Sequence, residues 1–216
     1  NSEATAREVH GRIGVPTRRL SVLQLGFNPG QLRPLGYQRE AELLVLGRHD
    51  PHKNLRRLLK AVPARRDRGH RIHFGGPHDR RYTPKLQALA QELGIASRCR
   101  WTAWVSNDER LELLNRARAL VMPSLWEGFG LPALEAMACG TPVLASTAGA
   151  LPEVVGEVAV PLDPMSSAQM AAAIDDFLQS SALQQQLAQQ GPLRAAGFSW
   201  AQTGADLKQR LQALCP

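Results

Sequence analysis

From about residue 41 onward, short apolar runs alternate with segments whose apolar residues recur at helical spacing. Strands that alternate with helices of this length form βαβ units, which bury a parallel sheet between two layers of helices. We therefore expect an α/β fold built on a Rossmann-like, doubly wound parallel sheet. The expected strands are Leu43–Leu46, Arg71–Phe74, Cys99–Ala103, Ala119–Pro123, Pro142–Ala145 and Val158–Pro161. The expected helices between them are Asn54–Val62, Pro84–Leu93, Asp108–Ala117 and Leu131–Ala138.

The two ends of the chain lie outside this alternation. Residues 1–40 do not fit the sheet cleanly, although Leu20–Leu25 could form a strand. Residues 166–190 have the pattern of helices rich in Gln and Ala. Ser199 is the expected N-cap of a final helix from Trp200 to Leu214.

The charge of the chain is unevenly distributed. Lys and Arg outnumber Asp and Glu by 26 to 19, which gives a net charge of +7. Residues 1–118 hold 23 basic and 11 acidic side chains, a net +12, whereas residues 119–216 hold 3 and 8, a net −5. A basic half favours phosphate-bearing partners, nucleic acid among them, or is simply a solvated Arg-rich surface. Aromatic residues are only 5% of the chain and are not interleaved with the basic ones, which argues against a nucleic-acid surface.

Cysteine usage and hydropathy bear on the cellular compartment. Cys99, Cys139 and Cys215 are odd in number and far apart, so we expect a reducing, cytoplasmic location rather than a disulfide scaffold. No apolar run reaches the roughly 18–20 residues that span a bilayer, and no signal peptide is recognisable. The chain begins with Asn1 rather than Met, so we expect a fragment of a longer protein.

The turn after the first expected strand carries two cations. In parallel sheets ligands bind beyond the carboxyl ends of the strands, on the turns that lead into helices. The Gly- and Pro-rich turns that should share this rim follow Leu46, Phe74 and Met122. In the first of them Arg48 could grip a phosphate bidentately, and Lys53 would act as a point charge. The N-terminus of the next helix, which Asn54 could cap, adds N–H donors. The alternative is an ordinary loop with solvated charges.

The turn after the fourth expected strand places two carboxylates, Glu127 and Glu135, eight residues apart across a Gly-Phe-Gly sequence. Its glycines let a ligand approach the backbone closely and offer N–H donors. Carboxylates accept hydrogen bonds from vicinal hydroxyls, so this pair suits a sugar or a ribose. Pro132 stands where a helix begins, so we place Glu135 in the first turn of that helix. A capping-box role for Glu135 would need Ser or Thr at 132, and Glu127 could be a plain loop charge.

Metal ligands are sparse. His49/His52 and His70/His73 have i, i+3 spacing without acidic or cysteine ligands beside them, which favours solvated histidines over a metal site. No D-x-D sequence occurs, so a carboxylate-held Mg²⁺ or Mn²⁺ for a diphosphate is not expected. Neither a Walker A loop nor a G-x-G-x-x-G fingerprint is present. Three tryptophans could stack on a base or pack at the core and rim: Trp101, Trp104 and Trp126.

A series of motifs runs through the chain: Gly47-Arg48 with Lys53-Asn54-Leu55, Pro123–Pro132 leading into Glu135–Gly140, Thr141–Val143, Gly149–Val154 and Phe198–Trp200. Together these motifs resemble the C-terminal, donor-binding domain of the retaining glycosyltransferases of GT-B fold in family 4, also called group 1. The resemblance covers most of residues 41–214. The chain would then form one half of a GT-B fold.

The resemblance extends weakly to the N-terminal segment. Ser2-x-x-Thr5 and Val22–Phe27 resemble the seam that leaves the N-terminal acceptor domain, although Leu25-Gly26-Phe27 departs from the usual Asn-Gly-Val. The implied organisation is a remnant of that seam at residues 1–40, a nucleotide-sugar donor-binding domain at residues 41–196, and a C-terminal helix at residues 197–216.

The resemblance also implies roles for the rim residues. Arg48 and Lys53 would hold the donor diphosphate, and Glu127, which would contact the transferred sugar, would complete the catalytic group. Glu135 would accept hydrogen bonds from the ribose, and backbone near Val105 would meet the base. The full implied donor-binding set is Gly47, Arg48, Lys53, Val105, Glu127, Gly128, Phe129, Gly130, Leu131 and Glu135.

The implied function is transfer of a hexose from a nucleoside diphosphate sugar to a saccharide or lipid-linked acceptor in surface polysaccharide assembly, with no metal or other cofactor. The run Lys53–Leu59 is similar to that of bacterial mannosyltransferases, which favours mannose. Because the acceptor would bind to the N-terminal domain, this chain alone would transfer little. The full-length protein could associate peripherally with the inner face of the membrane. The alternative is a non-catalytic module that binds a nucleotide-sugar.

Overall fold

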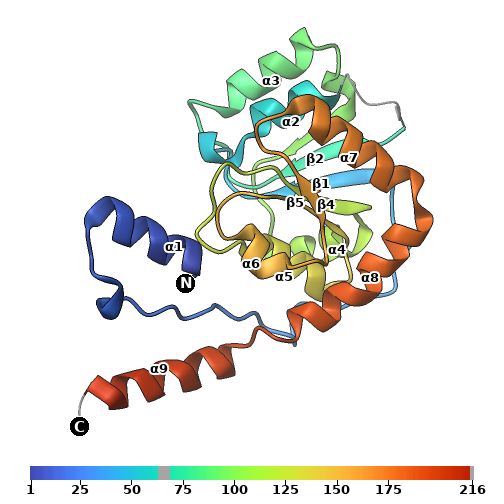
Figure 1. The fold of residues 1–216 in the computed structure, drawn as a ribbon. Coiled ribbons are helices and arrows are strands. Elements are labelled where there is room, and N and C mark those ends of the chain that lie inside the picture. Colours follow the sequence, from blue (N-terminus) through green and yellow to red (C-terminus); the bar gives the residue numbers. More distant parts are fainter. Residues whose placement is uncertain (63–68, 215–216) are drawn as a thin grey trace.

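The computed structural model describes residues 1–62 and 69–214, and its centre is a six-stranded parallel sheet in the order β3-β2-β1-β4-β5-β6 (Figure 1). The strands are β1 Glu42–Leu46, β2 Arg71–Gly75, β3 Cys99–Thr102, β4 Ala119–Met122, β5 Val143–Ser146 and β6 Val160–Leu162. All neighbouring strands run parallel. The predicted Rossmann-like, doubly wound parallel sheet is confirmed.

Helices cover both faces of the sheet. They are α1 Glu3–Glu8, α2 Leu55–Ala61, α3 Thr83–Glu92, α4 Asn107–Arg116, α5 Leu131–Ala138, α6 Leu151–Val155, α7 Ser167–Gln179, α8 Ser181–Ala195 and α9 Trp200–Leu214. In Figure 1 helices α2, α3 and α7 lie on one side of the sheet, and α4, α5 and α6 lie on the other, with α8 packed on α5. The expected helices are all present, and α5 and α9 have the predicted bounds.

The core follows from the alternation of side chains along each strand. Leu43 and Val45 of β1 pack in the layer under α2, α3 and α7, whereas Leu44 and Leu46 pack in the layer under α4 and α5. All four side chains are buried. A parallel sheet that is covered on both faces needs such continuous apolar strands, and burying each Leu or Val contributes roughly 1.5–3 kcal/mol. The same apolar runs are what predict the strands from the sequence.

The segment that precedes the sheet corrects one prediction. Residues 21–26 form no strand, and the only pairing of this part of the described chain is an isolated bridge between Phe27 and Ser199. The segment runs beside α9 instead, where the Thr203 hydroxyl donates to the Gln24 carbonyl over 2.7 Å. Apolar composition suggested a strand, but the segment contacts α9 instead of pairing with the sheet. Ser199 caps α9 as predicted, because its Oγ accepts from the Gln202 N–H.

Arg39 lies just before β1 and forms hydrogen bonds with the ends of two helices. Its guanidinium donates to the carbonyls of Leu114 and Ala117 at the end of α4, and to that of Gly140 just after α5. The last carbonyls of a helix have no donor within the helix, and here Arg39 supplies one, joined at Leu114 by the Thr141 hydroxyl. One side chain therefore joins two helix termini to the first strand.

Two further predictions can be compared with the fold. Cys99 and Cys139 are free thiols, while Cys215 lies outside the described residues. Within the same ranges no helix combines the length and the hydropathy that a membrane span requires.

Candidate functional site

The sheet changes direction between β1 and β4, and this position is where a ligand crevice is expected. The chain proceeds from β1 to one edge of the sheet and from β4 to the other, so the turns after these two strands diverge. Two residue pairs, Leu43–Ala119 and Leu44–Leu120, join β1 to β4. Beyond them the turns stay connected by a hydrogen bond from the Leu125 N–H to the His52 carbonyl. The two turns singled out from the sequence therefore meet at one rim.

Gly47 opens the first of these turns at a point of close backbone approach. Its φ is +128°, and its N–H donates to the Gly75 carbonyl. A Cβ added at Gly76 would lie 2.5 Å from the Gly47 oxygen, so neither strand end tolerates a side chain here. The aliphatic part of Lys53 lies over Gly47, with Cε 3.6 Å from where a Cβ would stand. Arg48 is exposed, and its side chain contacts no acceptor among the described residues.

Lys53 and Glu127 form an ion pair across the crevice. Lys53 Nζ lies 2.6 Å from Glu127 Oε1, and the two side chains are only 18% and 11% exposed. The Ser124 hydroxyl donates to the same oxygen over 2.7 Å. The predicted diphosphate cation and the predicted sugar carboxylate thus share one cluster, and Glu127 is held in place before any ligand arrives.

Asn54 has a different role from the predicted one. It adopts a left-handed conformation, with φ +59°, and its side chain does not cap α2. Its Nδ2 instead donates to the carbonyls of Pro123 and Pro164, both over 2.8 Å. Asn tolerates this backbone region better than most residues, so Asn54 ties the β1 turn to the turn after β4.

The glycine turn presents a row of free N–H groups. In the described part of the chain no acceptor meets the backbone N–H groups of Gly128, Phe129, Gly130 or Leu131. Gly130 has φ +107° and stands at the N-cap of α5, and a Cβ there would lie 2.6 Å from a methyl group of Leu151. The dipole of α5 adds a positive end to these donors, so the turn suits an anionic or hydroxylated ligand.

Glu135 lies just past the first turn of α5, whereas the sequence predicts it within that turn. The helix begins at Leu131 as predicted, so Glu135 is its fifth residue and belongs to the second turn. Its carboxylate pairs with Arg110 Nη1 over 3.0 Å. Burial raises the pKa of Glu135, and the charge of Arg110 opposes that rise. The pairing keeps a buried carboxylate available as a hydrogen-bond acceptor.

Of the remaining predicted residues, Val105 lies on the rim, Trp101 packs in the core, and two tryptophans are exposed. Val105 packs against Gly75 at the end of β2, with a methyl 3.2 Å from where a Cβ would stand, and so lies on the same rim. Trp101 stacks on Phe74 with ring centroids 4.2 Å apart, which makes it part of the core rather than a base platform. Trp104 and Trp126 are exposed, at 74% and 43%.

The prediction of solvated histidines is wrong for His49 and His73, which are both buried. No three His, Cys, Asp or Glu side chains gather closely enough to hold a metal ion within residues 1–62 and 69–214. His49 is buried, and its Nδ1 lies 3.0 Å from the Thr83 hydroxyl. Burial is the main cause that lowers the pKa of His49 to about 4; nearby His78 contributes to the lowering, and Asp50 opposes it. His52 is exposed, as expected of a solvated histidine.

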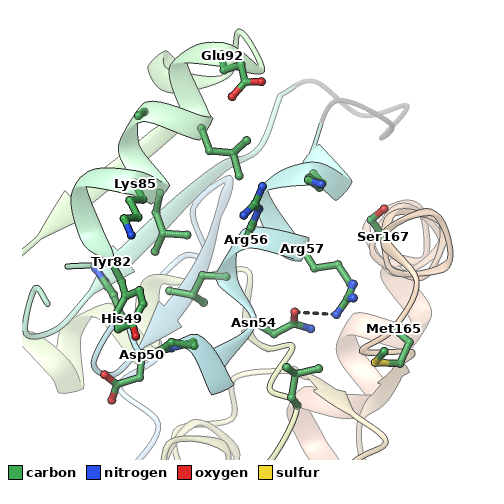
Figure 2. A pocket seen from close by; sticks show the side chains of 17 residues that line it. His49, Asp50, Asn54, Arg56, Arg57, Tyr82, Lys85, Glu92, Met165 and Ser167 are labelled. Carbon is green, nitrogen blue, oxygen red and sulfur yellow. Dashed lines mark hydrogen bonds between the residues drawn. The ribbon is translucent and has the colours of Figure 1, made fainter.

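A groove of about 880 Å³ lies on the other side of the first turn, between α2 and α3 (Figure 2). Arg56 and Lys85 stand on its two walls, and the apolar Leu86 also lines it. None of the predicted donor-binding residues lines this groove. The predicted site is therefore an open rim at the carboxyl ends of the strands, separate from the large groove.

Two site residues were missed from the sequence, Arg110 and Ser124. Arg110 lies in the first turn of α4, and helices that follow strands of one parallel sheet begin at the same rim. That rule could have placed Arg110 near Glu135. Ser124 directly follows β4, three residues before Glu127, a spacing that suits a local hydrogen bond.

Comparison with known proteins shows which family the chain resembles. A family model described as glycosyl transferases group 1 matches residues 34–194. The chain is 33% identical over 215 residues to the MMP alpha-(1->4)-mannosyltransferase of Mycolicibacterium hassiacum, covering 94% of this chain and 51% of that protein. It is 33% identical over 160 residues to the O-antigen chain mannosyltransferase B of Escherichia coli, covering 73% of this chain and 42% of that protein. The chain thus spans about half the length of these relatives.

Solved structures show the same fold. Sucrose-phosphate synthase from Thermosynechococcus elongatus superposes with a TM-score of 0.86 at 25% identity, over 97% of this chain and 56% of that one. Anabaena HepE, solved in complex with UDP and glucose, superposes with a TM-score of 0.89 at 20% identity, over 99% of this chain and 62% of that one. The family match covers well over half of the chain, and the relatives at 33% identity are glycosyltransferases. The chain therefore belongs to the glycosyl transferases group 1 family.

Proposed function

We propose that this chain is the donor-binding part of a retaining glycosyltransferase that moves a hexose, mannose being the favoured one, from a nucleoside diphosphate sugar to a saccharide or lipid-linked acceptor. The observation that carries the proposal is the rim cluster of Lys53, Glu127 and the free N–H groups of the glycine turn. The mannosyltransferase names of several relatives support the choice of sugar. Such a transfer would be a step in surface polysaccharide assembly.

The donor would lie along the rim from α4 to the first turn. Its base would meet backbone near Val105, and its ribose hydroxyls would donate to Glu135, which Arg110 already orients. The diphosphate would lie between Arg48, Lys53 and the N–H groups at the start of α5. Glu127 would then accept hydrogen bonds from the sugar hydroxyls.

The chemistry would be electrostatic. Breaking the bond between the anomeric carbon and the diphosphate develops negative charge on the leaving group, while the sugar becomes oxocarbenium-like. Arg48, Lys53 and the N–H groups at the start of α5 would stabilise this charge, an effect worth roughly 3–4 kcal/mol per donor in other enzymes. Lys53 would at the same time connect the leaving group to Glu127 on the sugar side.

Calorimetric titration of the 216-residue chain with a panel of nucleoside diphosphates and their sugars tests this proposal. Arg48→Ala or Lys53→Ala should weaken nucleoside diphosphate binding about tenfold and leave bare nucleoside binding unchanged, since each removes a charged hydrogen bond. Arg56→Ala, an exposed cation on the α2 side of the turn, is the matched control and should bind like wild type. Equal losses for nucleoside and diphosphate, or displacement of the nucleotide-sugar by duplex DNA at physiological salt, would overturn the assignment.

Catalysis needs a second measurement on the full-length gene product. Turnover of a nucleoside diphosphate sugar above the buffer control identifies a transferase, whereas tight binding without turnover identifies a non-catalytic binding module. We expect turnover by the longer protein and little or none by this chain alone. Cell fractionation should place the full-length protein in the cytoplasm or on the inner face of the membrane.

A further inference from the structure

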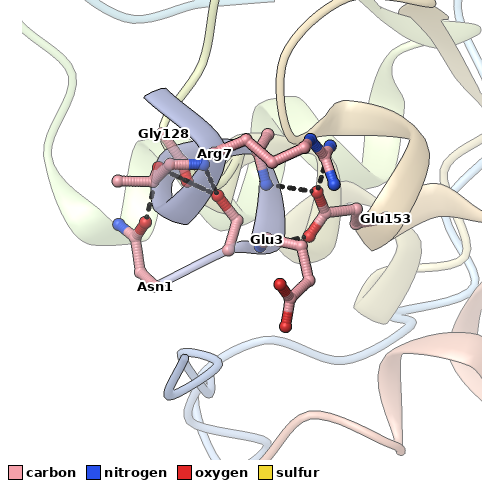
Figure 3. A network of polar contacts seen from close by, with 8 residues as sticks. Asn1, Glu3, Arg7, Gly128 and Glu153 are labelled. Atoms are coloured by element: carbon pink, nitrogen blue, oxygen red, sulfur yellow. Dashed lines mark hydrogen bonds and ion pairs between the residues drawn. The ribbon is translucent and has the colours of Figure 1, made fainter. Parts of the chain in front are cut away.

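Helix α1 is far from the sheet in sequence but directly contacts the glycine turn. Figure 3 shows its residues beside Gly128 on one side and Glu153 on the other. A cavity of about 700 Å³ is lined by Arg7 of α1 together with Trp126 and Gly149 of the loops around Glu127. Helix α1 therefore shares a cavity with the loop residues that flank Glu127.

Two hydroxyl groups of α1 hold one carbonyl of the turn. The Ser2 hydroxyl donates to the Gly128 carbonyl oxygen over 2.7 Å, and the Thr5 hydroxyl donates to the same oxygen over 3.1 Å. A carbonyl has two lone pairs, so both donors can be accepted at once. In a trans, planar peptide the carbonyl and the following N–H point in opposite directions. Fixing the Gly128 oxygen therefore fixes the direction of the Phe129 N–H, which is free of acceptors among the described residues.

Glu153 holds α1 itself in place. Its carboxylate accepts from the backbone N–H groups of Glu3 and Ala4 over 2.8 and 2.7 Å, and it also pairs with Arg7. The Ser2 hydroxyl accepts from the Thr5 N–H and completes the cap of the helix. Glu153 stands in α6, just after the loop in which the Ala150 N–H donates to the Glu127 carbonyl. The same short region thus supports both α1 and the backbone of Glu127.

We propose that Ser2, Thr5 and Glu153 are positioning residues, which set the direction of the Phe129 N–H so that it meets the diphosphate or sugar of the donor. This role rests on the proposed function. It assigns a task in donor binding to a segment that lies outside the sheet, and it links the placement of α1 to the affinity of the rim for its ligand. In the proposed binding mode the nucleoside end of the donor would lie near Val105, away from this contact.

The test separates the hydroxyl donors from the helix cap. In the double variant Ser2→Asp/Thr5→Val, Asp still caps α1 by accepting from the Thr5-position N–H, but neither side chain donates to Gly128 at neutral pH. The double variant Ser2→Thr/Thr5→Ser keeps both hydroxyls and should restore wild-type behaviour. Thr203→Val removes a comparable hydroxyl–carbonyl bond between α9 and residue 24 and serves as the matched control. Melting temperatures establish that each variant is folded.

The first measurement needs no ligand. The backbone order parameters of Phe129 and Gly130, measured by ¹⁵N relaxation, should fall from a rigid value near 0.85 toward about 0.6 in Ser2→Asp/Thr5→Val. They should stay at the wild-type value in the Thr203→Val control. Unchanged order parameters in the folded double variant would overturn the proposal.

The second measurement is calorimetric titration with a nucleoside, its diphosphate and its diphosphate sugar. The double variant should bind the diphosphate sugar about tenfold more weakly and the nucleoside as tightly as wild type. Glu153→Gln should produce the same selective loss, because α1 is then held less firmly. Equal affinities for the diphosphate sugar in wild type and variant would overturn the positioning role. If wild type binds no nucleotide at all, the proposed function fails, and the order parameters alone decide whether α1 orients the turn.

Discussion

At the scale of single residues, Lys53 and Glu127 neutralise each other's charge when no ligand is bound. Each group is largely buried, and a buried charge without a partner is costly. In the free chain each group therefore satisfies the other, with Ser124 as a further donor to Glu127. An arriving diphosphate would compete with Glu127 for the ammonium group of Lys53.

This competition gives Glu127→Gln two opposite effects. The variant keeps an oxygen for Ser124 but no longer holds Lys53 by charge, so the affinity for a bare nucleoside diphosphate should rise slightly. The affinity for the diphosphate sugar should fall, because a charged acceptor for the sugar hydroxyls is lost, at about 1.5–3 kcal/mol. Titration should show the ratio of the two affinities shifting at least tenfold against the sugar. Ser124→Ala, which leaves the charge of Glu127 in place, is the control. Weaker binding of the bare diphosphate by Glu127→Gln than by wild type would contradict the expected opposite effects on the two ligands.

His49 predicts a pH dependence of folding stability. The folded protein keeps this buried histidine neutral down to about pH 4, whereas an unfolded histidine takes up a proton near pH 6.5. Between these values the unfolded state binds more protons, so the free energy of unfolding should fall as the pH drops from 6.5 to 4. The loss should approach about 3 kcal/mol. Urea melts across this pH range should show the fall in the free energy of unfolding in wild type and in the His52→Gln control. In His49→Gln the free energy of unfolding should depend less on pH. The same pH dependence in all three proteins would exclude His49 as its source.

The main site residues could be located from the sequence because topology decides where they go. Residues that follow parallel strands must gather at one rim, so the alternation of strands and helices is enough to place Arg48, Lys53 and Glu127 together. The partners of these residues could not be found in this way, since Arg110 reaches Glu135 only through the packing of α4 beside α5. The predicted cap at Asn54 was wrong because its side chain bonds two distant carbonyls rather than its own helix.

At the scale of elements, α5 carries a carboxylate that titrates unusually. The helix begins with Leu131 and Pro132, which places Glu135 in the buried second turn, where burial raises its pKa despite Arg110. Its start could be predicted because Pro132 favours the first turn of a helix. The strand predicted at residues 20–25 was wrong, because composition alone does not tell whether a strand will find a partner.

The raised pKa of Glu135 should appear in nucleotide binding. As the pH falls through that pKa the carboxyl gains a proton, so it loses an acceptor for the ribose hydroxyls and the affinity decreases. This decrease in affinity should begin at a higher pH than it would for a Glu with an ordinary pKa near 4.3. Glu135→Gln should abolish this pH dependence. Glu109→Gln is the control and should retain the pH dependence, because hydrogen bonds with Ser106 lower the pKa of Glu109. If Glu135→Gln left the pH dependence of nucleotide binding unchanged, the assignment would be refuted.

At the scale of the whole molecule, three cationic side chains lie around the crevice. The chain has no D-x-D sequence, and Arg48, Lys53 and Arg110 supply positive charge around the crevice. Donor binding by this chain, and turnover by the full-length protein, should therefore be unchanged by EDTA. Calorimetry and a transfer assay with and without chelator would measure this. A loss that Mn²⁺ or Mg²⁺ restores would contradict the proposed electrostatics.

The strand order has a kinetic consequence. Strands β1 to β3 pair with their neighbours in the chain, as do β4 to β6, so each half of the sheet can assemble from local contacts. The pairing of β1 with β4 instead closes a loop from Leu46 to Ala119, and long loops close at a higher entropic cost. We expect docking of the two halves to be the last step of folding and their separation to be the first step of unfolding. Because the crevice forms only when they dock, a bound donor should slow unfolding without speeding folding.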